Sequence, residues 1–212
     1  ELCDITEALV YTEPYNDERG RNRVFPPIAD FVKEKLYEDQ GLHCEVAKLK
    51  MDFMTRAQSL IHGDLHTGSI FINEESTKVF DPEFCFYGPM GYDIGNVIAN
   101  MIFAWANGDA AGAADFCKWV EDVLVDVINM TKEKMEKYYD EHVTDTMCRN
   151  ELYKKYYMDT IIEDTSAVAG LELIRRIVGM ANVKDITTIA DEAKRARAEK
   201  ICITAAIDFI KD

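Results

Sequence analysis

The chain has 212 residues, a formal net charge of −15, 48% hydrophobic residues and 30% charged residues. Its length suits one large domain, and its hydrophobic fraction is high enough to form a core. The negative charge disfavours nucleic acids and anionic membranes as partners, because both are negatively charged themselves. No apolar run approaches the ~20 residues of a membrane span, and the six cysteines form no Cys-x-x-Cys pair. We therefore expect a cytoplasmic protein with reduced thiols.

The hydrophobic pattern changes along the chain. Residues 8–11 resemble a short strand, whereas residues 27–38 and 42–59 have the apolar spacing of helices. A predicted hairpin follows, because β-branched and aromatic residues at 69–72 and 78–80 flank a polar turn. The remaining helices are expected at 91–107, 113–139, 150–163, 168–182 and 189–210. The sequence thus predicts a mainly α fold with one small β-hairpin, of the α+β class.

The predicted hairpin brings acidic residues together. Asp64 comes just before the first strand and Asp81 just after the second, and these ends are adjacent in an antiparallel pair. Phosphoryl transfer needs one carboxylate to accept or orient the proton of the attacking hydroxyl and another to hold magnesium. Asp64 fits the first role. Asp81 and Glu83 fit the second, since magnesium takes one or two protein carboxylates, and Pro82 between them limits flexibility.

Two strings of residues carry a family resemblance. The first is His62-Gly63-Asp64-Leu65-His66-Thr67-Gly68-Ser69-Ile70, and the second is Asp81-Pro82-Glu83-Phe84 followed by residues 86–95. Both resemble the catalytic loop and the metal-binding motif of the protein-kinase-like fold. Their full length is similar to the S-methyl-5-thioribose kinases, which are small-molecule kinases related to the aminoglycoside and choline kinases. This resemblance implies a C-terminal lobe of the protein-kinase-like fold.

The match differs from the general kinase pattern in several ways. Ser69 stands where kinases have an Asn, so it can offer a metal only a hydroxyl. Glu83 replaces the usual Gly and restores a charged metal ligand. No glycine-rich phosphate loop occurs in the chain, and no strand-borne Lys precedes Asp64. We therefore expect residues 1–212 to be the C-terminal catalytic and substrate-binding lobe of a longer kinase, inactive without its nucleotide-binding lobe.

The resemblance also implies a reaction. It implies ATP-dependent phosphorylation of S-methyl-5-thioribose to its 1-phosphate in methionine salvage, with magnesium as cofactor and a homodimeric enzyme. The residues alone predict only phosphoryl transfer to a hydroxyl. The alternatives are another small-molecule kinase of the aminoglycoside or choline type, and an inactive kinase-like binding module. A metal-dependent hydrolase with His62, Asp64 and His66 as ligands is also open, because alternate residues of an extended segment share a face.

A pair of arginines, Arg175 and Arg176, lies in an otherwise apolar predicted helix. Buried arginines need partners. One interpretation pairs them with Glu172 on the surface, and the other turns them toward the cleft to bind the sugar or the phosphoryl group. The resembling kinases carry a twin arginine on a late helix, which favours substrate binding. Because adjacent helical residues point about 100° apart, we expect at most one to reach the phosphoryl position.

Two further residues are expected to have structural roles. In kinase-like folds the histidine of the catalytic loop supports the loop backbone, and the resemblance gives this role to His62. The same folds use an aspartate at the start of the following helix to bind the loop backbone through hydrogen bonds, and here it corresponds to Asp93.

Overall fold

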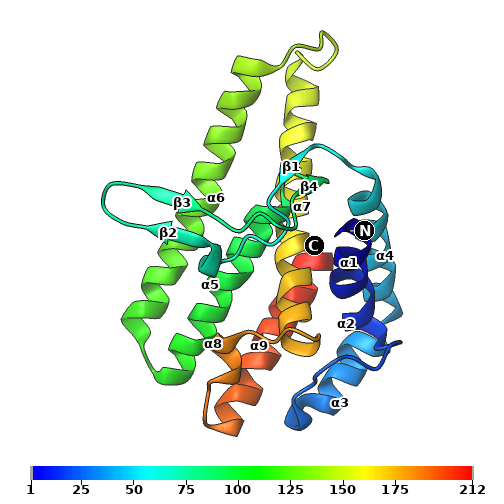
Figure 1. The fold of residues 1–212 in the computed structure, drawn as a ribbon, viewed down its shortest axis with the longest axis vertical. Coiled ribbons are helices and arrows are strands. Elements are labelled where there is room, and N and C mark those ends of the chain that lie inside the picture. Colours follow the sequence, from blue (N-terminus) through cyan, green and yellow to red (C-terminus); the bar gives the residue numbers. More distant parts are fainter. Residues whose placement is uncertain (1, 212) are drawn as a thin grey trace.

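The computed structural model describes residues 2–211, and it is mainly helical with two small antiparallel sheets (Figure 1). The longer helices are α4 (Gln40–Thr55), α5 (Tyr92–Ala111), α6 (Ala114–His142), α7 (Glu151–Val178) and α9 (Glu192–Lys211). The shorter ones are α1 (Leu2–Thr6), α2 (Glu13–Asn16), α3 (Ala29–Val32) and α8 (Lys184–Thr187). This confirms the predicted mainly α class with a small β component. None of the helices within residues 2–211 has the length and hydropathy to cross a membrane.

The core forms where α7 packs between α5 and α9. Phe103 of α5, Leu171 and Ile174 of α7, and Ile203 of α9 are completely buried. Each such side chain stabilises the fold by about 1.5–3 kcal/mol relative to an exposed position. Gly95 lets α5 approach α7 closely, since a Cβ there would lie 2.7 Å from the carbonyl oxygen of Thr165. The arginine-bearing helix is therefore held rigidly against the start of α5.

The strands form one interrupted hairpin. Their bounds are β1 (Ser59–Ile61), β2 (Ile70–Ile72), β3 (Thr77–Val79) and β4 (Phe86–Gly88). The inner pair β2–β3 is the predicted hairpin, and the outer pair β1–β4 was not predicted. Between the two pairs lie loop A (residues 62–69) and loop B (residues 80–85). Because both pairs are antiparallel and nested, they hold loops A and B opposite each other.

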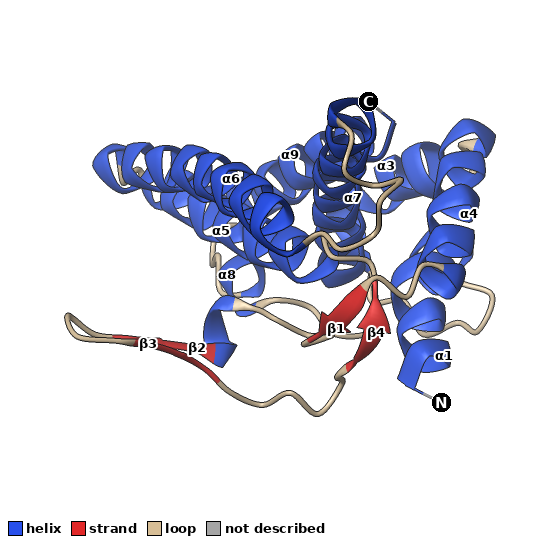
Figure 2. Ribbon diagram, turned by 90° about the horizontal axis from the view of Figure 1, so that it is seen from above, coloured by secondary structure: helices blue, strands red, loops and turns tan. Residues whose placement is uncertain are grey.

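Both sheets lie on one side of the helical layer, and the β2–β3 hairpin extends away from the body (Figure 2). On the other side of loops A and B, the β1–β4 pair contacts α4. At the far end of the molecule, α6 and α7 project together as a long helical hairpin (Figure 1). Loops A and B are thus held between two strand pairs, with β2–β3 at one end and β1–β4 at the other.

Three local predictions were wrong. Residues 8–11 belong to a π-helical stretch, Glu7–Thr12, between α1 and α2, where Val10 and Tyr11 are buried in a helical core. The helix expected over 42–59 ends at Thr55, because the last residues turn and form β1. The two helices expected at 150–163 and 168–182 are the single helix α7. Its polar middle continues as helix because buried Asp164 is paired with Arg56 at 2.7 Å.

Candidate active site

Loops A and B touch through their backbones at Gly63. This residue has a φ of +83°, and a Cβ on it would lie 2.2 Å from the carbonyl oxygen of Phe84. Only glycine has neither the steric penalty of this φ nor the clash. The contact therefore places the residues around Asp64 beside those that follow Asp81.

Asp93 fixes loop A from the first turn of α5. Its carboxylate accepts hydrogen bonds from the backbone N–H of His62 at 2.6 Å and of Gly63 at 3.0 Å. Burial raises the pKa of Asp93, although the two backbone donors oppose this shift. The structure thus confirms the structural role expected for Asp93.

The imidazole of His62 joins the two loops. Its Nδ1 accepts a hydrogen bond from the backbone N–H of Asp64 at 3.4 Å, so Nε2 carries the proton and donates it to the carbonyl oxygen of Phe80 at 2.9 Å. One ring therefore spans the distance between the backbone of Asp64 and the residue before Asp81. This confirms the supporting role expected for His62, and both ring nitrogens are already in use within the protein.

The Asp64 carboxylate binds both arginines of α7. Its Oδ1 accepts hydrogen bonds from Nη2 of Arg175 at 3.0 Å and from Nη2 of Arg176 at 3.2 Å. Long side chains thus overcome the difference of about 100° in direction between adjacent helical residues. The Asp64 side chain remains 31% exposed, so the carboxylate is accessible to a substrate.

Glu172 pairs with both arginines, but it does so in the interior and not on the surface as one interpretation expected. Its side chain is 1% exposed and accepts hydrogen bonds from Nε of Arg175 and Nε of Arg176. Burial favours the neutral acid, but the two positive charges outweigh it and lower the pKa of Glu172 to about 2. Burial would also lower the pKa of Arg175, yet Glu172 raises it. Glu172 and Arg175 are therefore both charged at neutral pH.

The magnesium ligands predicted from the sequence lie in loop B. Asp81 and Glu83 are exposed, and neither carboxylate has a hydrogen bond or ion pair within residues 2–211. Asp81 has a φ of +68°, a strained conformation for any residue other than glycine, and such strain often occurs at functional sites. Two free carboxylates of this kind fit magnesium, which completes its octahedron with phosphate oxygens and water.

Ser69 and His66 occupy the end of loop A. The His66 Nδ1 accepts a hydrogen bond from the Gly68 N–H at 3.0 Å, and its Nε2 lies 3.3 Å from the Ser69 hydroxyl and 4.0 Å from Oδ2 of Asp64. Ser69 is 3% exposed. Metal binding by Ser69 stays a prediction. Among residues 2–211 no three His, Cys, Asp or Glu side chains gather as a metal site. The hydrolase alternative needs His62 as a ligand, but both nitrogens of its ring are engaged in hydrogen bonds within the protein.

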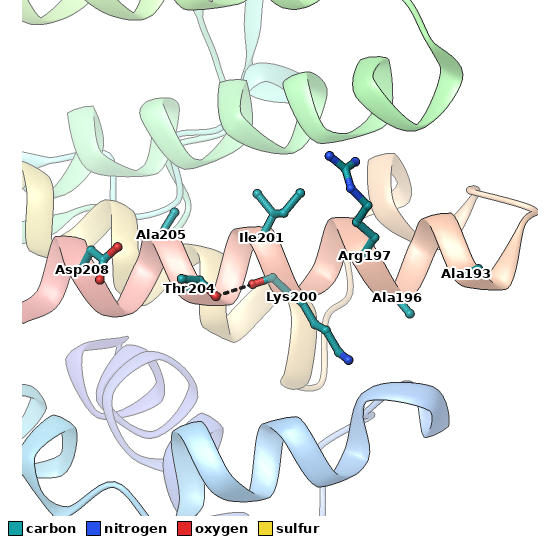
Figure 3. Close-up of a pocket in the computed structure, with 8 residues that line it drawn as sticks. All are labelled: Ala193, Ala196, Arg197, Lys200, Ile201, Thr204, Ala205 and Asp208. Atoms are coloured by element: carbon teal, nitrogen blue, oxygen red, sulfur yellow. Dashed lines mark hydrogen bonds between the residues drawn. The ribbon is translucent and has the colours of Figure 1, made fainter.

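A separate groove of about 760 Å³ runs along α9 (Figure 3). Its lining residues all come from α9 and none from loops A and B. Arg197 in this groove is paired with Asp109, and the Lys200 ammonium lies 5.5 Å from the centre of the Phe31 ring. The groove therefore contains none of the catalytic or metal-binding residues predicted from the sequence.

A known protein family matches the first part of the chain. The model of the phosphotransferase enzyme family matches residues 1–124, which is more than half of the 212 residues. The chain belongs to the phosphotransferase enzyme family. The matched span contains Asp64, Asp81 and Asp93, whereas the two arginines of α7 lie beyond it.

Several curated phosphotransferases are similar over almost the whole chain. Methylthioribose kinase 1 of Oryza sativa subsp. japonica is 37% identical over 230 residues, which cover 100% of this chain and 53% of the rice protein. Methylthioribose kinase of Bacillus pumilus is 36% identical and is covered to 52%. The enzyme of that name from Escherichia coli O45:K1 is 35% identical and is covered to 54%. The chain spans about half the length of the curated relatives it matches.

Replacing Gly63 by Ala should destabilise this phosphotransferase and displace loop A. The positive φ costs about 1–2 kcal/mol for a residue with a Cβ, and the clash with the Phe84 carbonyl adds to it. Gly112→Ala is a matched control, since Gly112 has a φ of +76° and a Cβ at this position would meet no atom within 4 Å. Thermal unfolding should show a larger loss for Gly63→Ala. Equal losses would mean that the contact with loop B contributes nothing.

Proposed function

We propose that this chain is the C-terminal catalytic and substrate-binding lobe of an ATP-dependent kinase that converts S-methyl-5-thioribose to its 1-phosphate. The observation that carries the proposal is Asp64, an accessible carboxylate whose Oδ1 is held by Arg175 and Arg176. The names of the similar proteins supply the substrate.

In the proposed reaction, Asp64 orients the anomeric hydroxyl of the sugar and accepts its proton. Because the arginines occupy Oδ1, Oδ2 is the oxygen that faces the substrate. The Nη2 edges of Arg175 and Arg176 lie beside this position, where a fixed guanidinium binds sugar oxygens or stabilises charge on the transferred group. Magnesium held by Asp81 and Glu83 would neutralise charge on the ATP phosphates.

The charges near Asp64 favour a neutral acceptor over a cationic one. The two arginines balance Asp64 and Glu172, so these four groups sum to zero charge. Aminoglycosides and choline are cations, which would lose hydration on binding without gaining net attraction from this neutral cluster. A neutral sugar meets no such penalty. This observation favours methylthioribose over the substrates of the related kinases.

The nucleotide-binding lobe is part of the same proposal. The chain spans about half the length of its relatives, and Phe71, Ile72 and Val79 on the β2–β3 hairpin are more than half exposed. An apolar surface of this kind fits contact with another part of the protein. We also propose a cytoplasmic location, where thiols stay reduced, and a homodimer, which sedimentation of the full-length protein would test.

The test is a substrate panel with the full-length protein. With ATP and magnesium, turnover should be greatest for methylthioribose, and phosphorus NMR should show a sugar 1-phosphate. Choline, kanamycin and ribose serve as competing acceptors. Residues 1–212 alone should show no turnover, because no lysine or glycine-rich loop holds the phosphates in line. Preferential phosphorylation of choline or kanamycin would contradict the substrate, and no turnover of any acceptor would favour a binding module.

A further inference from the structure

Glu172 holds the two arginines by the same edge. Its Oε2 pairs with Nε of Arg175, and its Oε1 lies 2.8 Å from Nε of Arg176 and 3.3 Å from Nη2 of Arg175. On each arginine, Nε donates to Glu172 and the neighbouring Nη2 donates to Oδ1 of Asp64. The planar fork of arginine makes this geometry specific, because Nε and Nη2 are fixed side by side in one plane and so set the position of Asp64 relative to Glu172.

The charge of Glu172 also determines what the arginines do to Asp64. Two buried guanidinium groups facing a single carboxylate would have one uncompensated positive charge, which is costly in the interior. They would then draw on both oxygens of Asp64 and occupy the lone pairs that must accept the substrate proton. With Glu172 present, the two arginines share a second carboxylate in the interior, which balances the second positive charge.

We propose that Glu172 is a positioning residue that directs both arginines to Oδ1 of Asp64 and keeps Oδ2 available as the base. This role rests on the proposed kinase function. Glu172 touches no substrate in this scheme, and it acts only through Arg175 and Arg176.

The test compares Glu172→Gln with a matched control in the full-length enzyme. Glu199 of α9 is also 1% exposed, and it pairs with Arg195 at four-residue spacing and 2.9 Å. Glu172→Gln should lower kcat for the sugar about 10- to 100-fold, as expected when reacting groups are misplaced by about 1 Å. The KM for ATP should stay within about twofold of wild type, because a positioning role does not involve the nucleotide. Glu199→Gln should leave both constants unchanged while lowering the melting temperature.

A second variant, Glu172→Asp, keeps the charge and should recover part of the lost kcat. Wild-type kcat in Glu172→Gln would overturn the positioning role, and so would equal losses in the Gln and Asp variants. Failure of both variants to fold, while Glu199→Gln folds, would make Glu172 a purely structural residue. The wild-type enzyme is assayed first. Absence of sugar phosphorylation there contradicts the proposed function itself, whereas a normal wild type with an unaffected Glu172→Gln contradicts only the role of Glu172.

Discussion

Asp64→Asn in the full-length protein should lower kcat by about 10²–10⁴-fold, the usual contribution of a positioned general base. The amide keeps the shape of the side chain but cannot accept the hydroxyl proton. ATP binding should be retained, because the carboxylates proposed to hold magnesium belong to loop B and not to loop A. Steady-state kinetics with methylthioribose, together with calorimetric titration of ATP, would measure both quantities.

A control for Asp64→Asn is Asp159→Asn, since Asp159 is an exposed carboxylate of α7 that pairs with Lys155. This variant should behave as wild type, because exposed ion pairs contribute about 0–1 kcal/mol. In Asp64→Asn, Glu172 is the remaining carboxylate partner of Arg175 and Arg176. An anion should therefore bind at these two arginines at least as well as in the wild type. A wild-type kcat in Asp64→Asn would remove Asp64 from the role of base.

The hairpin and the long helices could be predicted because their signals are local. Alternating β-branched residues around a polar turn predict the β2–β3 pair, and three- and four-residue apolar spacing predicts α5, α6 and α9. The outer pair β1–β4 has three residues in each strand. Strands β2 and β3 are equally short, but one polar turn joins them directly, whereas the residues that pair in β1 and β4 lie far apart in the chain. The two helices predicted at 150–163 and 168–182 were not recognised as one helix for a similar reason. Asp164, which lies between them, is paired with Arg56, and Arg56 comes from a distant segment of the chain.

In the site, sequence spacing identified the partners but not their environment. Glu172 lies three and four residues before the arginines, so the pairing was visible, whereas its burial in the interior was not. The convergence of Arg175 and Arg176 on one oxygen was also hidden, because helical directions describe Cβ positions and not the ends of long side chains. The proximity of loops A and B could be predicted from the hairpin, but the backbone contact at Gly63 depends on the full fold.

Asp81→Asn should reduce turnover by about 10³-fold and raise the magnesium concentration needed for half-maximal rate. The metal stabilises charge on the transferred phosphoryl group by several kcal/mol, and an amide oxygen binds magnesium more weakly than a carboxylate. Asn is the informative replacement because Asp81 has a φ of +68°, which Asn tolerates nearly as well as Asp does. The variant therefore removes the charge without adding backbone strain, as Ala would.

The comparison of Asp81→Asn with Asp64→Asn separates the metal ligand from the base. Magnesium titrations of the rate and of ATP binding should shift to higher concentration in Asp81→Asn and stay in place in Asp64→Asn. Glu83→Gln should shift the titration in the same direction, because it removes the second carboxylate of the proposed pair. If Asp64→Asn and Asp81→Asn lose magnesium-dependent ATP affinity equally, the two loops do not divide the chemistry between them. Asp64 would then belong to the metal site, and the proton acceptor would have to be sought elsewhere.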